Sequence, residues 1–228
     1  MITLKESILN RSSHGAKGFE AQRREMIERW LDEYSIKDYT IKDDFTIDVD
    51  GFVLLDKENL KEFPEYIQFG VVRKSFYCTH NNLTSLRGCP REVGGSFYCT
   101  HNNLTSLEGA PENVGGTFIC SYNKLTSLEG APRKVGNDFY CSNNKLTSLE
   151  GAPKEVGSDF YCYNNQLTSL EGAPEIVKKK FNCSDNKLTT LEGAPKEVGG
   201  DFDCSDNKVK FTKDDVKEVC NAKGKIIY

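Results

Sequence analysis

The sequence predicts an α+β solenoid, in which short, similar turns of chain stack around one continuous core with a parallel β-sheet along one side. Three observations support this fold class: a 21-residue motif recurs along most of the chain, apolar residues alternate within each copy as they do on a strand, and the segment before the repeats has helical spacing. We expect an N-terminal cap over residues 1–52, a solenoid over 53–211 and a C-terminal cap over 212–228.

Size and composition are ordinary for a globular protein. The 228 residues are 37% hydrophobic and 28% charged, which is enough to form a sizeable core. The formal net charge of -4 argues against a general nucleic-acid binder, and no apolar run approaches the roughly 18–20 residues that cross a bilayer. Lys5 and Glu6 interrupt the first residues, so we expect no secretion signal and a cytoplasmic protein with reduced thiols.

The N-terminal cap is expected to contain a helix followed by a hairpin. Residues 18–38 place apolar side chains at helical spacing, and residues 39–56 alternate apolar and polar around Asp50–Gly51, which is typical of a hairpin turn. We expect Trp30 to pack in this cap rather than to bind a ligand. The apolar residues of the helix are Phe19, Met26, Ile27, Trp30, Leu31 and Tyr34.

The repeats have the form F-x-C-x-x-N-x-L-T-S-L-E-G-A-P-x-x-V-G-x-x. Phe and Cys point to the same side of a strand, Asn can bond backbone amides where the chain leaves the strand, and the two Leu face inward again. The G-A-P and V-G segments then return the chain along the back, and each turn covers the apolar edge of its neighbour. A degenerate copy occupies 53–75, and full copies begin at Phe76, Phe97, Phe118, Phe139, Phe160, Phe181 and Phe202.

The degenerate copy places Val53, Leu55, Leu60 and Phe63 where Phe, Cys, Leu and Leu recur. At the other end of the chain, Thr212 is typical of a helix start, and Val216, Val219 and Cys220 give a short apolar stripe. We expect the last residues, K-I-I-Y, to add a final strand.

The motif F-x-C-x-x-N-x-L resembles the leucine-rich repeat L-x-L-x-x-N-x-L, with Phe and Cys at two leucine positions. The phrase L-T-S-L-E-G-A-P is similar to the short repeats of secreted bacterial effector proteins, and more similar still to small leucine-rich repeat proteins of bacteria and their phages. The resemblance covers residues 53–211. It implies a leucine-rich-repeat solenoid with a parallel sheet on its concave face, which serves as a binding scaffold rather than a catalyst.

Seven cysteines recur at one position of the motif, and we expect them to form an inward column of small apolar side chains. The alternative is a metal or redox ladder, but metal sites need thiolates that converge on one point, whereas these run in a line. We therefore expect no metal and no other cofactor. Cys89 and Cys220 stand outside the column and are expected to be isolated free thiols, open to labelling. The column is Cys78, Cys99, Cys120, Cys141, Cys162, Cys183 and Cys204.

The outward strand positions are the expected binding surface. They change from aromatic and His-bearing near the N-terminus to acidic near the C-terminus, while the core positions hardly vary. Exposed tyrosines suit contact with a partner, but cross-strand stacking that only stabilises the sheet would select the same residues. His80 and His101 could form a metal or proton site, or be ordinary surface residues. The candidate site residues are Tyr77, Tyr98, Ile119, Tyr140, Tyr161, Tyr163, His80, His101, Tyr122 and Asp203.

The sequence contains no G-x-S-x-G, H-E-x-x-H or P-loop motif. We therefore expect a non-enzymatic, monomeric protein-binding scaffold that binds neither nucleic acid nor membranes. The resemblance suggests a bacterial protein, or a phage protein that acts on a host bacterial protein in the host cytoplasm. The alternative is a glycan-binding or structural protein of a virion or cell surface, because rows of tyrosine can also stack on sugar rings.

Overall fold

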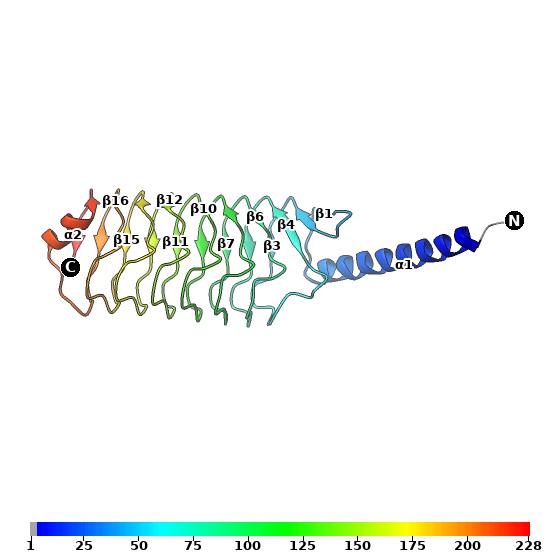
Figure 1. Ribbon diagram of the computed structural model, residues 1–228, viewed down its shortest axis with the longest axis horizontal. Coiled ribbons are helices and arrows are strands. Elements are labelled where there is room, and N and C mark those ends of the chain that lie inside the picture. The colour runs from blue at the N-terminus through cyan, green and yellow to red at the C-terminus, as the bar shows by residue number, and fades with distance from the viewer. Residues whose placement is uncertain (1–3) are drawn as a thin grey trace.

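The protein is a parallel β-solenoid with a helix at each end (Figure 1). The structure, a computed structural model, describes residues 4–228, with side chains from Gly18 onward. Within this part of the chain, successive turns stack along one axis and contribute strands to two long sheets (Figure 1). The expectation drawn from Lys5 and Glu6 concerns side chains outside the described residues.

One sheet has nine strands, and each turn of the solenoid adds one of them in parallel register. Phe pairs with Phe on the next turn, and the residue after Phe pairs with its equivalent, because every turn has the same length. The strands are β3 (Val53–Leu54), β5 (Phe76–Tyr77), β7 (Phe97–Tyr98), β9 (Phe118–Ile119), β11 (Phe139–Tyr140), β13 (Phe160–Tyr161), β15 (Phe181–Asn182), β17 (Phe202–Asp203) and β19 (Ile226–Ile227).

The second sheet has ten strands and adjoins the first through a short corner in each turn. All its pairs are parallel except the first, where β1 and β2 form an antiparallel hairpin. The strands are β1 (Tyr39–Ile41), β2 (Ile47–Val49), β4 (Phe69–Val72), β6 (Glu92–Val93), β8 (Asn113–Val114), β10 (Lys134–Val135), β12 (Glu155–Val156), β14 (Ile176–Val177), β16 (Glu197–Val198) and β18 (Asn221–Ala222).

This second sheet corrects the expectation of a sheet on one side only, with the chain returning along the back. In the repeats, each strand of this sheet has a single buried residue, Val, so the sequence shows no alternation like that of Phe-x-Cys. The dipeptides nevertheless become a sheet because stacking places them in register, as in the pairing of Val135 with Val114 and Val156. The corners approach so closely that a Cβ on Gly136 would overlap the carbonyl oxygen of Gly115, which explains why glycine follows this valine in most repeats; Lys178 after Val177 is an exception.

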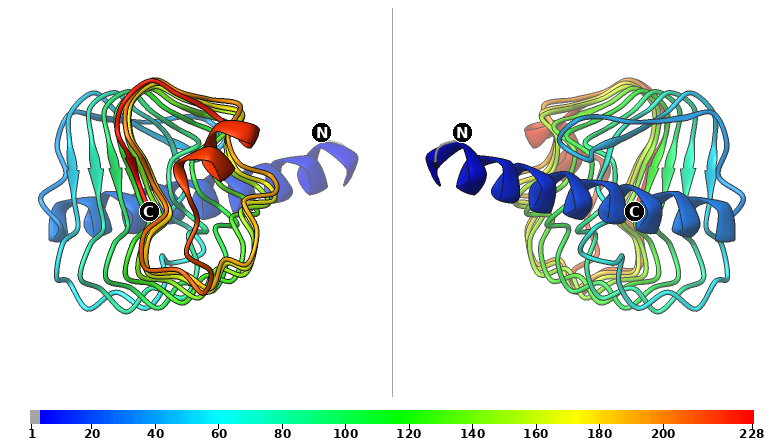
Figure 2. Two further views of the ribbon diagram at one scale, coloured as in Figure 1. Left: turned by 90° about the vertical axis from the view of Figure 1, so that its left-hand side faces the viewer. Right: turned by 90° about the vertical axis from the view of Figure 1, so that its right-hand side faces the viewer.

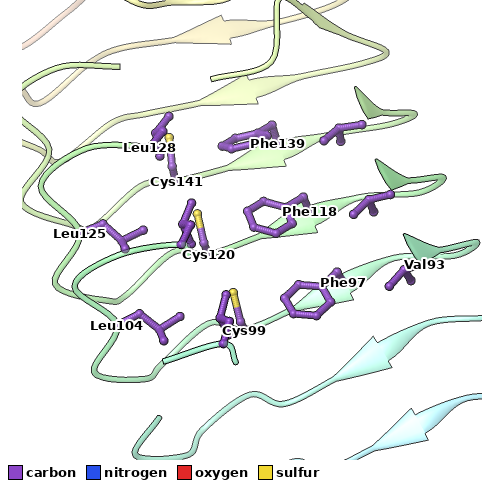
Figure 3. Packing of buried hydrophobic residues seen from close by; sticks show 14 of the residues in the cluster. Val93, Phe97, Cys99, Leu104, Phe118, Cys120, Leu125, Leu128, Phe139 and Cys141 are labelled. Carbon is purple, nitrogen blue, oxygen red and sulfur yellow. The ribbon is translucent and has the colours of Figure 1, made fainter. Parts of the chain in front are cut away.

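The core consists of columns of identical side chains that run the length of the solenoid (Figure 3). In the repeats that begin at Phe76 to Phe181, Phe and Cys on the nine-stranded sheet pack with the two Leu of the following loop and with Val of the ten-stranded sheet. The Phe rings of successive turns lie 5.2–5.7 Å apart between centroids, as between Phe97 and Phe118 at 5.7 Å. The predicted stacking of apolar positions is confirmed.

A ladder of asparagine side chains closes the bend after each strand of the nine-stranded sheet. Asn102 accepts a hydrogen bond from the Leu83 amide at 3.0 Å and donates to the carbonyl oxygens of Cys78 and Cys99 at 2.9 and 3.1 Å. The same pattern recurs at the motif asparagine of the other repeats, for example Asn165. The predicted capping role is confirmed, and the structure adds that each Asn links its own turn to the preceding one.

The N-terminal helix α1 (Leu4–Glu33) is longer than predicted and extends away from the N-terminal end of the solenoid (Figures 1 and 2). Its last turns pack on the first turn of the solenoid through Ile27, Trp30 and Leu31, which are buried. The Trp30 ring lies 6.2 Å from the ring of Phe69, so its predicted core role is confirmed. Phe19 is 67% exposed, because the helix passes beyond the edge of the sheet there.

The predicted hairpin exists, but its turn lies elsewhere. Strands β1 and β2 are joined by residues 42–46, where the Lys42 amide donates to the Thr46 carbonyl oxygen at 2.9 Å. Asp50–Gly51 instead forms the corner between the two sheets, because Val49 pairs with Val72 and Val53 with Phe76. Asp50–Gly51 thus occupies the same corner as the V-G segment of the later repeats. Sequence reasoning overlooked this equivalence.

At the C-terminus, α2 (Lys213–Val219) lies across the last turns (Figure 2). Thr212 caps it: its hydroxyl oxygen accepts from the Asp215 amide, and Asp215 in turn accepts from the Thr212 amide. The buried Val216 anchors the helix. The chain then adds β18 and β19 to the two sheets, which confirms the predicted final strand at residues 226–227.

Candidate functional site

The outward side of the nine-stranded sheet carries the first set of candidate residues in a single line. We call this surface the tyrosine face. Parallel register places each member directly beside its equivalent on the next turn. Along the chain its members are Tyr77, Tyr98, Ile119, Tyr140, Tyr161, Asn182 and Asp203.

The tyrosines of this face form two stacked pairs. The rings of Tyr77 and Tyr98 lie 4.6 Å apart with 7° between their planes, and those of Tyr140 and Tyr161 lie 4.6 Å apart with 12°. This spacing is close to the distance between neighbouring strands, so the ring faces point along the solenoid axis. The side chains are half-buried rather than fully exposed, because each covers its neighbour. Cross-strand stacking that stabilises the sheet is therefore one role of the tyrosines.

Ile119 interrupts this ladder. It pairs with Tyr98 on one side and Tyr140 on the other, so two ring faces look across a shorter aliphatic side chain. The two rings are separated by two strand spacings, about 9.6 Å. Within residues 18–228, no aromatic pair bridges this interval. Tyr163 stands beside the second pair, with its ring edge-on to Tyr161 at 6.4 Å.

A second column of candidate residues follows the strand and has an unusual backbone. Its members have φ between 52° and 57°, in the left-handed region where His, Asn and Asp are enriched. The rings of His80 and His101 stack at 4.3 Å, and those of His101 and Tyr122 also at 4.3 Å. The column is His80, His101, Tyr122, Asn143, Asn164, Asp185 and Asp206.

The left-handed backbone thus explains why His recurs at this position. Sequence reasoning did not use this recurrence to predict the backbone conformation. In His80 and His101, Nδ1 lies 3.2 and 3.1 Å from the hydroxyl of the preceding threonine. Partial burial lowers the pKa of His101, and the neighbouring His80 lowers it further because two stacked cations would repel. Among the described residues, no three His, Cys, Asp or Glu side chains gather where they could hold a metal ion.

A third column, two residues before each tyrosine, supplies charge to the same face. Ser75, Ser96, Asp138 and Asp159 each accept a hydrogen bond from the backbone amide of the equivalent residue one turn on, at 2.8–3.1 Å. Burial raises the pKa of Tyr140, and the charges of Asp138 and Asp159 raise it further. The carboxylates therefore lie close enough to the tyrosines to influence the ionisation of their hydroxyls.

The acidic end of the tyrosine face differs from the expectation of an open contact surface. Asp203 is 8% exposed, and its carboxylate accepts from the Ser205 hydroxyl at 2.7 Å and pairs with Lys180 Nζ at 3.4 Å. Lys178, two residues before Lys180, is paired too and lies 2.9 Å from Glu155. Asp203 is thus satisfied within the chain, and the accessible part of the face lies toward Tyr140.

All nine cysteines are buried and free, which corrects the expectation for two of them. The seven-membered column lies inside, and its thiols donate to carbonyl oxygens of the next turn, as Cys120 does to Tyr140 at 3.4 Å. Cys89 is 3% exposed and lies against Cys78, and Cys220 is 4% exposed beneath α2. Both were expected to be open to labelling, but Cys89 replaces an alanine that already faces the core, and α2 turns Cys220 inward.

Sequence reasoning also missed a hollow on the outer side of the ten-stranded sheet. It has a volume of about 1040 Å³ and lies over β8, β10 and β12, where the glycine corners and the Ala–Pro segments leave little side-chain volume. Arg133, Lys134 and Lys154 are among the charged residues that line it. The recurrence of small residues at the same positions of the motif is the signal that could have indicated it.

No helix within the described residues combines the length and the apolarity needed to cross a membrane. A scan against models of known protein families finds none that matches the chain, and a search of curated proteins finds no match either.

Proposed function

We propose that the protein is a non-enzymatic binding scaffold that recognises another protein through the tyrosine face. The observation that carries this proposal is the contrast between the inside and the outside of the same strands. Phe and Cys hardly change from turn to turn, whereas the outward residues vary in size and charge over the same turns. Solenoids that present a constant core and a varied surface commonly use that surface for recognition.

The chemistry of the face favours a protein partner. Tyr98, Tyr140, Tyr161 and Tyr163 combine large ring area with a polar hydroxyl, and such residues dominate the binding energy of protein interfaces. They are held by stacking and by parallel strands, so little side-chain freedom remains to be lost on binding. A monomer in the cytoplasm fits this role.

The resemblance to leucine-rich repeats supports the same proposal. The motif shares the spacing of apolar residues and the asparagine ladder of that class, and we infer that the chain is a leucine-rich repeat protein of the short bacterial type. A phage origin, with a host bacterial protein as the target, rests on the L-T-S-L-E-G-A-P phrase alone.

Glycan binding is the second candidate, and the rows of tyrosine motivate it. Sugar rings pack on the faces of aromatic rings, but the stacked pairs turn half of these faces toward one another. A glycan would therefore find open faces only at the two ends of each pair, beside Leu54, Ile119 and Asn182. This geometry favours a protein partner over a glycan or a structural role on a virion.

The test is a pull-down from bacterial lysate with the wild-type protein, run beside a glycan array. Replacing Tyr140 and Tyr161 by alanine is expected to weaken binding of the captured protein about tenfold or more, because hot-spot aromatics contribute roughly 2 kcal/mol or more each. The melting temperature of this variant is expected to fall only modestly, through lost cross-strand stacking.

Leu146→Ala is the matched control, because Leu146 lies in the core beneath the same turns. It is expected to cost about 2–5 kcal/mol of stability and to leave the affinity of the folded protein unchanged. If the double tyrosine variant binds the partner as tightly as the wild type does, the proposal is wrong. Selective binding of the protein on the glycan array would favour the second candidate.

A further inference from the structure

We propose that the tyrosine face receives an arginine side chain from a basic segment of the partner protein, stacked on Tyr140 over Ile119 and paired with Asp138. This inference rests on the proposed function and deepens it by naming the chemistry of the partner. Three features of the structure converge on this place: an open ring face, an aliphatic floor and carboxylates that lack a cation.

The open ring face comes from the break in the ladder. Tyr140 stacks on Tyr161 with one face, and its other face looks across Ile119 toward Tyr98. A flat group stacks about 3.5 Å from a ring, so the interval of about 9.6 Å accommodates one such group. The half-buried Ile119 side chain forms an apolar floor for the methylene stem of a long side chain.

The carboxylates decide which flat group fits. Asp138 and Asp159 stand on adjacent turns of the same face, since Phe139 pairs with Phe160. Oδ2 of Asp138 lies 3.5 Å from the Thr117 hydroxyl, which places it beside the turn that carries Ile119. Among the ion pairs of residues 18–228, none includes Asp138 or Asp159. The one lysine of this column, Lys180, pairs with Asp203 instead.

The fold itself does not require acids at these two positions. Each aspartate accepts a hydrogen bond from the backbone amide of the equivalent residue one turn on. The hydroxyls of Ser75 and Ser96 accept the same hydrogen bond at 2.9 Å. Like charges placed directly opposite each other on neighbouring strands are destabilising. The glutamates that follow the second Leu of each repeat, such as Glu150 and Glu171, also repeat like charges, but their longer, exposed side chains can separate in solvent. Asp138 and Asp159 are half-buried and short. Asp159 also accepts a hydrogen bond from the Tyr161 hydroxyl at 3.1 Å, whereas Oδ2 of Asp138 has only the 3.5 Å contact with Thr117. The charge of Asp138 is therefore the one most available to a partner.

Arginine matches this combination better than lysine does. Its planar guanidinium stacks on a tyrosine face and can at the same time donate two hydrogen bonds to a carboxylate. A lysine ammonium can pair with the carboxylate but has no flat surface to place on the ring. The site therefore predicts a preference for arginine, in addition to a general attraction for positive charge.

The probe is a fluorescein-labelled Gly/Ser peptide with spaced arginines, compared by fluorescence anisotropy with the same peptide carrying lysines. Wild-type protein is expected to bind the arginine peptide about fivefold or more tightly than the lysine peptide. The double variant Asp138→Ser and Asp159→Ser keeps the backbone contacts, loses the hydrogen bond from the Tyr161 hydroxyl to Asp159, and is expected to bind the arginine peptide about tenfold more weakly. Circular dichroism checks its fold, and Asp138→Asn with Asp159→Asn serves if the serine variant does not fold.

The matched control is Glu150→Gln with Glu171→Gln, which removes the same charge from adjacent turns of an exposed column away from the tyrosine face. It is expected to bind both peptides as the wild type does. Equal affinity of the wild-type protein for the two peptides would overturn the inference, as would equal weakening by the glutamate control.

The protein captured from lysate distinguishes this inference from the proposed function. If its binding depends on Tyr140 and Tyr161 but not on Asp138 and Asp159, the tyrosine face is the binding site and the arginine inference is wrong. If its binding depends on neither pair, the proposed function is wrong as well. Loss of binding in both double variants supports both.

Discussion

At the scale of single residues, the solenoid depends on buried polar groups as much as on apolar ones. Asn102 is 8% exposed, and its one side chain satisfies an amide and two carbonyl groups that belong to two different turns. Buried backbone groups without partners are costly, so the bend after each strand is closed by this amide. The asparagine of the motif is therefore a structural residue.

Replacing Asn102 by alanine is expected to lower the free energy of unfolding by about 2–4 kcal/mol, because the Leu83 amide and the carbonyls of Cys78 and Cys99 lose their partner. The neighbouring Asn103 is the control. Lysine occupies its position in the next repeat, as Lys124, so Asn103→Ala is expected to change stability by less than about 0.5 kcal/mol. Urea denaturation followed by circular dichroism measures both, and equal effects would contradict the assigned role.

The motif allowed the inward and outward residues of each turn to be predicted, because a fixed period repeats each environment. It did not reveal why His, Tyr, Asn and Asp share the second position after Cys. That position has a left-handed backbone, and the stacked rings of His80, His101 and Tyr122 follow from its repetition. The enrichment of His, Asn and Asp at one position of the motif is the signal that indicates such a backbone.

At the scale of elements, the cysteine column is a titratable part of the core. Burial raises the pKa of Cys99, Cys141 and Cys183 well above the ordinary value, and that of Cys204 and Cys220 to about 11. An acid whose pKa is raised by folding retains its proton in the native state. Its contribution to stability is therefore complete below the pKa of the unfolded thiol and is lost as the pH rises above it.

Stability is thus expected to be level up to about pH 8 and to fall between pH 8.5 and 10, by about 1.4 kcal/mol per pH unit for each buried thiol once the unfolded thiol ionises. Urea titrations at several pH values measure the slope. Cys120→Ala with Cys141→Ala removes two of these thiols and is expected to make the slope shallower by about twice that amount. A slope that is the same in this variant and in the wild type would contradict the account.

Elements marked by apolar alternation or helical spacing were predictable, and those without such a pattern were not. The nine-stranded sheet follows from the Phe-x-Cys alternation, whereas the ten-stranded sheet consists of dipeptides whose pairing exists only after stacking. Asp50–Gly51 was assigned to a hairpin turn because the local pattern favours one. Tertiary stacking overrides that preference, since the pair lies at the corner that every later turn repeats.

At the scale of the whole molecule, repetition separates stability from recognition. The inward columns form a core that each turn shares with its neighbours, so the outward residues can change without loss of the fold (Figure 3). The tyrosine face uses this freedom: two stacked tyrosine pairs, a break at Ile119 and an acidic centre at Asp138 and Asp159 occupy one side of a regular scaffold. The location of this face was predictable from the sequence. The open ring face beside Ile119 and the lack of a cation near Asp138 became apparent only from the side-chain contacts of the structure.

Hydroxyl-radical footprinting of the protein with and without its captured partner tests most directly whether the tyrosine face is the binding surface. Mass spectrometry then reports the oxidation rate of each aromatic side chain. We expect Tyr98, Tyr140, Tyr161 and Tyr163 to oxidise more slowly in the complex, and the exposed Tyr228 at the C-terminal end to oxidise at an unchanged rate. Protection of Phe19 on α1 with unchanged rates at the four tyrosines would contradict the account and place the binding surface on the N-terminal helix.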